Sequence, residues 1–278
     1  MVKTTKELLQ EHDFLIKKKY GQNFLTDNNI INKIVSGANL TQEHTVLEVG
    51  PGLGSLTSAL SKIAKHVICI EIDKTLIPIL NSHGFDNVDI VEGDVLKVDI
   101  DSLIQEKQPV SVVANLPYYI STPIITKLLM LKIESITIMI QKEVADRLKA
   151  KPATKSYGSL TVFVNYHADV SHITTVPPGC FIPRPGVDSS VIHLKLNKKQ
   201  KPIDEEFFYK LVRQSFSQRR KTLLNSLTAK GSELNLSKEQ IQQGFVDLGI
   251  SENSRGETLS LENFINLSDI LLKIKKKP

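Results

Sequence analysis

Two absences narrow what this 278-residue chain can be. Cysteine occurs only at Cys69 and Cys180, far apart in the sequence, so neither a disulfide framework nor a metal site is expected. No apolar run approaches the roughly 18 residues of a transmembrane helix, and the first residues lack the apolar core of a signal peptide. The sequence therefore predicts a cytoplasmic protein that binds no metal and no membrane.

An excess of negative charge is also missing. The net charge is +5, which points to a polyanionic partner. Between residues 198 and 230 there are nine lysines and arginines against three acids, a local excess of six. Such a run is either a solvated face or a face that contacts phosphates, and charge alone favours neither interpretation.

What the chain does have is a glycine-rich loop in residues 46–57, VLEVGPGLGSLT, between an apolar run and a segment able to start a helix. Glycine is needed where a ligand lies against the backbone, and Gly50 and Gly52 are the candidate positions. The loop has no lysine, which excludes a P-loop, and Ser55 stands where the dinucleotide fingerprint needs its third glycine. The common loop that remains is that of S-adenosylmethionine-dependent methyltransferases.

Strand-like and helix-like segments alternate after residue 45, which predicts a parallel α/β sheet of the Rossmann-like kind. The expected strands cover residues 45–49, 66–72, 88–91, 110–114, 135–140, 173–176 and 191–196. A methyltransferase domain is expected over residues 1–199, with a helix at residues 5–16 and another that starts after the cap Asp27. A small all-α, RNA-binding domain is expected over residues 200–278, with helices at 205–216, 221–227, 238–248 and 261–274. The lysine-rich tail, residues 273–277, is predicted to be disordered.

Polar residues follow four consecutive strands, at the edge where open α/β sheets bind ligands. They are Gly50, Glu71, Asp94 and Asn115. Glu71 is placed to accept from both hydroxyls of a ribose, and Asp94 from the amine of an adenine. Taken singly, each acid would be interpreted as a solvated residue at a strand end or as the N-cap of a helix. Their common position in sheet order favours a cofactor site.

The fourth strand runs into Asn115, Leu116, Pro117 and Tyr118. The carboxamide oxygen and the adjacent peptide carbonyls form an acceptor cluster, which the proline stiffens. These acceptors would hold the N–H groups of an adenine amine and orient its nitrogen toward a methyl donor, without general base catalysis. The tyrosine offers a ring for stacking, and Phe181 is either a second stacking ring or a core residue. Without the glycine loop earlier in the chain, these four residues would be interpreted as a turn at the end of a strand.

Seven segments together resemble the ribosomal RNA adenine N6-dimethyltransferases, and within them the KsgA-type small-subunit enzymes. They are YGQNFL at 20–25, EVGPGLG at 48–54, NLPY at 115–118, QKEVA at 141–145, YGSL at 157–160, FIPRP at 181–185 and FSQRRK at 216–221. The resemblance implies a Rossmann-like methyltransferase domain with a reversed seventh strand and a helical C-terminal domain. It also implies S-adenosylmethionine contacts at Asn23, Leu25, Gly50, Glu71, Asp94 and Asn115. From the sequence pattern alone, Asn23 is either a turn residue or part of a lid.

The implied substrate is a pair of adjacent adenines in the 3′-terminal hairpin loop of 16S rRNA, each methylated twice within an immature small subunit by a monomeric enzyme. The candidate RNA contacts are Arg147, Lys149, Arg184, Arg219, Arg220 and Lys221. The chain departs from the family at Gly186, where lysine is usual, which removes one cation near the RNA side.

Three alternatives stay open. The related 23S rRNA methyltransferases that confer macrolide resistance share the loop and the acceptor motif, but typically have isoleucine at the position of Leu116 and lack a clear counterpart of Tyr157-Gly158. A non-catalytic assembly factor would usually have lost the loop or Asn115. A nicotinamide-dependent dehydrogenase is disfavoured by the glycine spacing.

Overall fold

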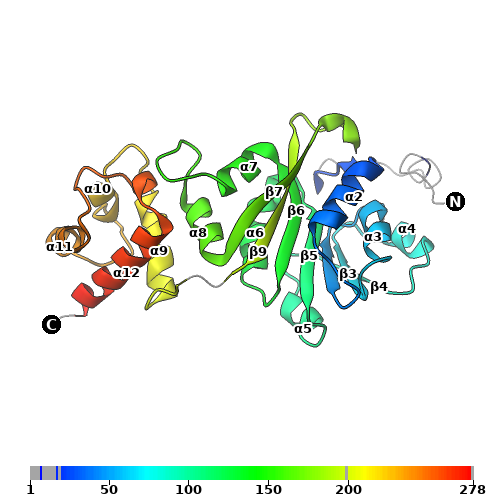
Figure 1. Cartoon of the computed structure of the whole chain (residues 1–278), viewed down its shortest axis with the longest axis horizontal. Helices are drawn as coiled ribbons and strands as arrows, with labels where there is room; N and C mark the ends of the chain where they lie inside the picture. The colour runs from blue at the N-terminus through cyan, green and yellow to red at the C-terminus, as the bar shows by residue number, and fades with distance from the viewer. Residues whose placement is uncertain (1–6, 8–16, 18–19, 198–199, 277–278) are drawn as a thin grey trace. The chain divides into compact units, whose positions relative to one another are not determined.

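The computed structural model describes residues 7, 17, 20–197 and 200–276 (Figure 1). Its contacts divide the chain into two units. The sheet unit comprises Met1–Ala145 and Val170–Leu196, and the helical unit comprises Asp146–Asp169 and Asn197–Pro278. The helix expected over residues 5–16 lies outside the described residues, except for residue 7.

Seven strands form one sheet in the order β4-β3-β2-β5-β6-β9-β7. Their bounds are β2 Thr45–Val49, β3 His66–Glu71, β4 Val88–Glu92, β5 Val110–Asn115, β6 Ser135–Gln141, β7 Ala168–Val176 and β9 Ser189–Leu196. Neighbouring strands from β4 through β6 pair in parallel, whereas β9 pairs antiparallel with β6. The central strands β2 and β5 are buried along almost their whole length, as expected for parallel strands covered on both faces. The Rossmann-like fold with one reversed strand is thus confirmed.

The helices of the sheet unit are short and connect consecutive strands. They are α2 Asn28–Gly37, α3 Ser55–Leu60, α4 Ile77–Ser82, α5 Ile100–Ile104 and α6 Ser121–Leu129, and α7 Lys142–Leu148 runs on into the helical unit. The predicted cap of α2 is confirmed, because the Asp27 side chain accepts from the backbone N–H groups of Asn29 and Ile30. The apolar face of α2 is buried at Ile30, Ile31, Ile34 and Val35.

A second, two-stranded sheet was not predicted. It consists of β1 (Phe24–Leu25) and β8 (Phe181–Ile182), which pair antiparallel. Next to it, Thr26 donates its backbone N–H to the carbonyl of Cys180 over 2.8 Å. Two-residue strands carry no periodic signal, so their pairing across the sequence could not be seen in advance. The pairing holds residues 20–25, which we call the strap, beside the proline-rich loop that contains Phe181.

The helical unit contains α8 Ser159–His167, α9 Glu205–Ser215, α10 Leu223–Leu227, α11 Lys238–Leu248 and α12 Leu261–Lys275. The four predicted C-terminal helices are present. However, the unit begins earlier than the expected boundary at residues 199 and 200. The reason is that Val162 and Tyr166 of α8 pack into the same apolar cluster as Phe208 of α9, a tertiary contact that the alternating pattern does not reveal.

The prediction of a disordered tail is wrong for residues 273–275. Helix α12 continues to Lys275, whose ammonium group donates to the carbonyl of Leu234 over 2.8 Å and lies 5.6 Å from the centre of the Phe207 ring. Lysines in the last turn also interact favourably with the negative end of the helix dipole. A run of lysines therefore extends this helix rather than ending it.

Candidate active site

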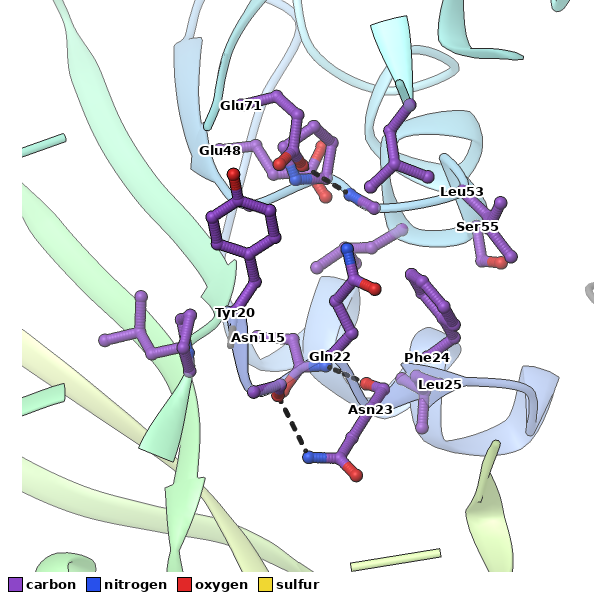
Figure 2. Close-up of a pocket in the computed structure, with 18 of the residues that line it drawn as sticks. Tyr20, Gln22, Asn23, Phe24, Leu25, Glu48, Leu53, Ser55, Glu71 and Asn115 are labelled. Carbon is purple, nitrogen blue, oxygen red and sulfur yellow. Dashed lines mark hydrogen bonds between the residues drawn. The ribbon is translucent and has the colours of Figure 1, made fainter. Parts of the chain in front are cut away.

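One pocket of the sheet unit is lined by four segments that the sequence had singled out (Figure 2). They are the strap, the glycine loop, the end of β3 and the tetrapeptide after β5. Together they contribute Tyr20–Leu25, Glu48, Gly50–Leu53, Ser55, Leu56, Glu71, Ile72, Leu76 and Asn115–Tyr118. Gly52 and Pro117 thus border the same space, so a single ligand can reach both the loop and the acceptor motif.

The glycine loop leaves room for a ligand beside its backbone. Gly50 has φ +68°, in the left-handed region that favours glycine, and an added Cβ there would meet no protein atom within 4 Å. Gly52 has φ +61°, and a Cβ there would approach the ring of Phe24 to 3.0 Å. Gly50 also lines the pocket, and its open surroundings fit a cofactor lying against the loop.

Glu71 ends β3 and is only 4% exposed. Its carboxylate accepts from the backbone N–H of Gly52 over 3.2 Å and from that of Asp73 over 2.8 Å. Burial raises the pKa of Glu71, while these backbone hydrogen bonds oppose the rise. Two N–H donors leave lone pairs on both oxygens, so the carboxylate can still accept from the hydroxyls of a ribose.

Glu48 is a pocket residue that was not among the predicted site residues. It lies in β2, is 1% exposed, and accepts from the hydroxyl of Thr57 over 2.7 Å and from the thiol of Cys69 over 3.5 Å. Burial raises its pKa to about 7, although the hydrogen bond from Thr57 works in the opposite direction. The bond to Thr57 ties the strand before the glycine loop to the helix after it. A glutamate two residues before the first glycine was the signal that could have identified it.

Asp94 follows β4 by two residues and is not among the residues that line this pocket. Its carboxylate accepts from the backbone N–H of Leu96 over 2.9 Å, and its side chain is 27% exposed. This bond uses one carboxylate oxygen and leaves the other able to accept from a further donor. The contact between Asp94 and the adenine of a cofactor therefore stays a prediction.

Asn115 is half-buried and points toward the strap, where its amide nitrogen donates to the backbone carbonyl of Asn23 over 3.1 Å (Figure 2). Leu116 is 1% exposed. The hydroxyl of Tyr118 shares a hydrogen bond with that of Ser189, the first residue of β9, and burial raises the pKa of Tyr118. The acceptor motif is thereby held from two sides.

Phe181 differs from the expectation of a stacking ring. It is 2% exposed and belongs to the apolar cluster that includes Leu25 and Ile31. A ring packed in this way has no free face for a base. The core interpretation, which the sequence also allowed, is the one that the structure favours.

The candidate RNA contacts differ in exposure. Arg184, Arg219, Arg220 and Lys221 are exposed, whereas Arg147 and Lys149 are half-buried. Within the helical unit, Arg219 forms an ion pair of 3.6 Å with Glu257 and donates to the carbonyl of Lys155. The four exposed candidates all lie in loops, whereas Arg147 belongs to α7.

Neither a metal site nor a membrane span is found in the part of the chain that the structure describes. No group of three or more His, Cys, Asp or Glu side chains is arranged to hold an ion there. The described helices include none that is both long and apolar enough to cross a bilayer. Both cysteines are free and buried.

Comparison with known proteins gives a consistent result along the chain. The sequence model of the family described as "Ribosomal RNA adenine dimethylase" matches residues 13–273. The ribosomal RNA small subunit methyltransferase A of Lachnoclostridium phytofermentans is 47% identical over 97% of this chain and 96% of its own length. Two solved structures resemble the fold over most of its length. A dimethyladenosine transferase from Plasmodium falciparum covers 91% of this chain and 98% of its own, with TM-score 0.78 and 28% identity. The 23S rRNA methyltransferase ErmE covers 90% and 99%, with TM-score 0.68 and 26% identity.

Proposed function

Because the chain belongs to the ribosomal RNA adenine dimethylase family, we propose that it methylates two adjacent adenines in the 3′-terminal hairpin loop of 16S rRNA, each twice at N6, with S-adenosylmethionine as the donor. The observation that carries the proposal is the single pocket bordered by both the glycine loop and the Asn115–Tyr118 motif. The identity of 47% over 97% of the chain to a ribosomal RNA small subunit methyltransferase supports the choice of ribosomal subunit.

The residues that line the pocket suit S-adenosylmethionine. Gly50 offers open backbone, Glu71 offers acceptors for the ribose, and the strap residues Asn23 and Leu25 form the facing wall. The cofactor supplies a methyl group made electrophilic by a positively charged sulfur. The carboxylate of Glu71 favours a cationic occupant of the pocket, because opposite charges attract strongly where water is excluded.

The chain's own residues act on the adenine by position rather than by proton abstraction. The Asn115 carboxamide oxygen and the carbonyl of Leu116 accept the N–H groups of the amine, which directs the nitrogen lone pair at the donor. Asn115 is not a base at neutral pH, so the displaced proton passes to water. The ring of Tyr118, held by Ser189, is the stacking surface for the base.

The RNA is recognised outside the pocket by exposed cations. Arg184 of the sheet unit and Arg219, Arg220 and Lys221 of the helical unit are the candidates for phosphate contacts, and Arg147 and Lys149 are placed less favourably because they are half-buried. We propose that the enzyme acts as a cytoplasmic monomer on the immature small subunit.

Labelling with methyl-labelled S-adenosylmethionine tests this function. Purified small and large subunits from cells that lack the gene are incubated separately with the enzyme, and the labelled nucleosides are identified by mass spectrometry. Dimethyladenosine in 16S rRNA alone is the expected result. Label in 23S rRNA alone would assign the chain to the large-subunit enzymes, and binding to the small subunit without label would leave a non-catalytic assembly factor.

A further inference from the structure

Asp73 is a buried carboxylate whose bonding suggests a task outside the cofactor contacts. It follows β3 by two residues, is 1% exposed, and is not one of the residues that line the pocket. It accepts from the ammonium of Lys17 over 2.7 Å, from the amide nitrogen of Gln22 over 2.9 Å, and from the backbone and hydroxyl of Thr75. Burial alone would raise the pKa of Asp73, but the hydrogen bonds from Lys17, Thr75 and Gln22 outweigh it and lower that pKa.

Two of these donors belong to the N-terminal part of the chain and fix the strap to the sheet. Gln22 lies within the strap, and its side-chain oxygen also accepts from the backbone N–H of Lys17 over 2.8 Å. The ammonium of Lys17 reaches Thr75 as well, over 2.7 Å. At its other end, the strap pairs with β8 through Phe24 and Leu25. Asp73 is thus the polar anchor of a segment whose other end is held by a backbone ladder.

The strap in turn fixes the orientation of Asn115. The carbonyl of Asn23 can only accept a hydrogen bond, so the Asn115 amide must direct its nitrogen toward the strap (Figure 2). The carboxamide oxygen is then left for the substrate. If the amide turned over, it would present N–H donors to the N–H donors of an adenine amine, which cannot hydrogen-bond to each other.

We propose that Asp73 is a positioning residue for methyl transfer: it anchors the strap so that the strap both closes the cofactor pocket and holds the Asn115 oxygen toward the adenine. This role rests on the proposed function. It predicts that loss of Asp73 affects the cofactor and the chemical step together, although Asp73 does not line the pocket.

Steady-state kinetics with Asp73→Asn and Lys17→Met test the anchor from both partners. For Asp73→Asn we expect KM for S-adenosylmethionine to rise about ten-fold and kcat to fall about ten-fold, because small displacements of a positioned group are costly. The affinity for rRNA should stay within about two-fold. Lys17→Met should produce the same pattern to a smaller extent, and the double variant should lose less than the sum of the two. The matched control is Asp89→Ala, which removes an aspartate paired with Lys107 over 3.2 Å elsewhere in the same sheet.

Nuclear magnetic resonance of the Asn115 side-chain amide reports directly on its hydrogen bond to Asn23, the contact that the anchor is proposed to hold. In protein labelled with ¹⁵N-asparagine, the signal is assigned by its disappearance in Asn115→Ala. We expect its protons to exchange slowly with water in the wild-type protein, and faster in Asp73→Asn and Lys17→Met but not in Asp89→Ala.

The two measurements separate the anchor from the function on which it depends. A wild-type protein that methylates no rRNA would end the proposed function, while the amide signal would still report on the anchor. A wild-type enzyme that turns over, with Asp73→Asn and Lys17→Met matching it in kcat, in KM and in the Asn115 signal, would overturn the positioning role alone. A lower melting temperature with unchanged KM and an unchanged signal would also overturn it, because it would reduce Asp73 to a structural residue.

Discussion

Charged groups are buried at the cofactor pocket but exposed in the basic loop of the helical unit, residues 219–221. Glu48 and Glu71 line the pocket and Asp73 lies beside it; all three carboxyl groups are nearly inaccessible, and each accepts hydrogen bonds from defined protein donors. In the loop after α9, Arg220 and Lys221 are exposed. Buried polar groups are costly unless their bonds are satisfied, so they fix geometry, whereas exposed cations attract a polyanion without fixing it.

This contrast matches two different tasks, methyl transfer in the pocket and RNA recognition in the loop. A methyl transfer that depends on orientation needs the buried, fully bonded groups. Recognition of a long phosphate backbone needs cations that adapt to it. Substitutions in the pocket should therefore change catalysis, cofactor affinity or stability with little dependence on salt. Substitutions in the loop should change RNA affinity and its salt dependence.

The largest effect is expected for Asn115→Ala, which removes an acceptor from the adenine amine. Single-turnover methyl transfer should slow by about 10³-fold, the size found when one preorganised hydrogen-bonding group is lost from an active site. RNA affinity, measured by fluorescence anisotropy, should stay within about two-fold because the phosphate contacts are untouched.

Asn87→Ala is the matched control for that variant. Asn87 is also half-buried, and its amide donates to the carbonyls of Ser61 and Ala64 instead of bordering the pocket. It should retain nearly all activity. Undiminished methylation by Asn115→Ala would contradict the role assigned to the acceptor motif.

The next effect concerns the pH dependence of stability through Glu48. Its pKa is raised from 4.5 to about 7, so the folded protein holds a proton that the unfolded chain releases at lower pH. The stabilisation from the neutral carboxyl is complete below pH 4.5 and is lost as the pH rises through 7. Glu48→Gln should therefore become more stable relative to wild type across this interval, by about 3 kcal/mol at most.

Urea unfolding at several pH values measures this difference. Glu43→Gln, at an exposed position of the same unit, controls for the loss of one negative charge. A constant difference between Glu48→Gln and wild type from pH 4.5 to 8 would show that burial of Glu48 carries no linked proton.

Much of this pocket could be predicted from the sequence because its parts lie at strand ends. Gly50, Glu71 and Asn115 lie at the carboxyl ends of strands whose period and order are local signals, and the topology brings them together. Contacts between distant segments could not be predicted. The pairing of Phe24 with Ile182 and the bond between Gln22 and Asp73 join segments without periodic patterns.

The same limit explains the expectations that differ from the structure. Glu71 ends β3 and lines the pocket, whereas Asp94 follows β4 and accepts from the N–H of Leu96 outside the pocket lining. The position at a strand end fixes where a residue lies and not where its side chain points. The burial of Phe181 likewise depends on its partner strand β1, and the packing of α8 on α9 depends on side chains more than forty positions apart.

A smaller effect on cofactor affinity is expected for Gly50→Ala. The added Cβ would occupy the open side of the loop and strain a backbone with φ +68°. Affinity for S-adenosylmethionine, measured by calorimetry, should fall about thirty-fold, because one misplaced contact group costs one to two powers of ten. Gly84→Ala is the matched control, since Gly84 has φ +63° and equally open surroundings but does not line the pocket. Equal losses in the two variants would mean that strain, and not the ligand, explains the result.

The smallest effect sharpens the comparison between the two regions, because it should appear only when salt is varied. Arg220→Ala with Lys221→Ala should weaken binding to 16S rRNA about ten-fold at physiological salt and reduce the slope of log affinity against log salt by about two. At saturating RNA, kcat should not change, since the pocket is intact. Lys238→Ala with Lys273→Ala removes the same charge from exposed positions outside the loop. If both pairs reduced the slope equally, the helical unit would attract RNA through its total charge, and the loop would have no special place in recognition. A slope that changes only for the loop pair would locate phosphate contacts there, in the part of the molecule where charge is exposed rather than buried.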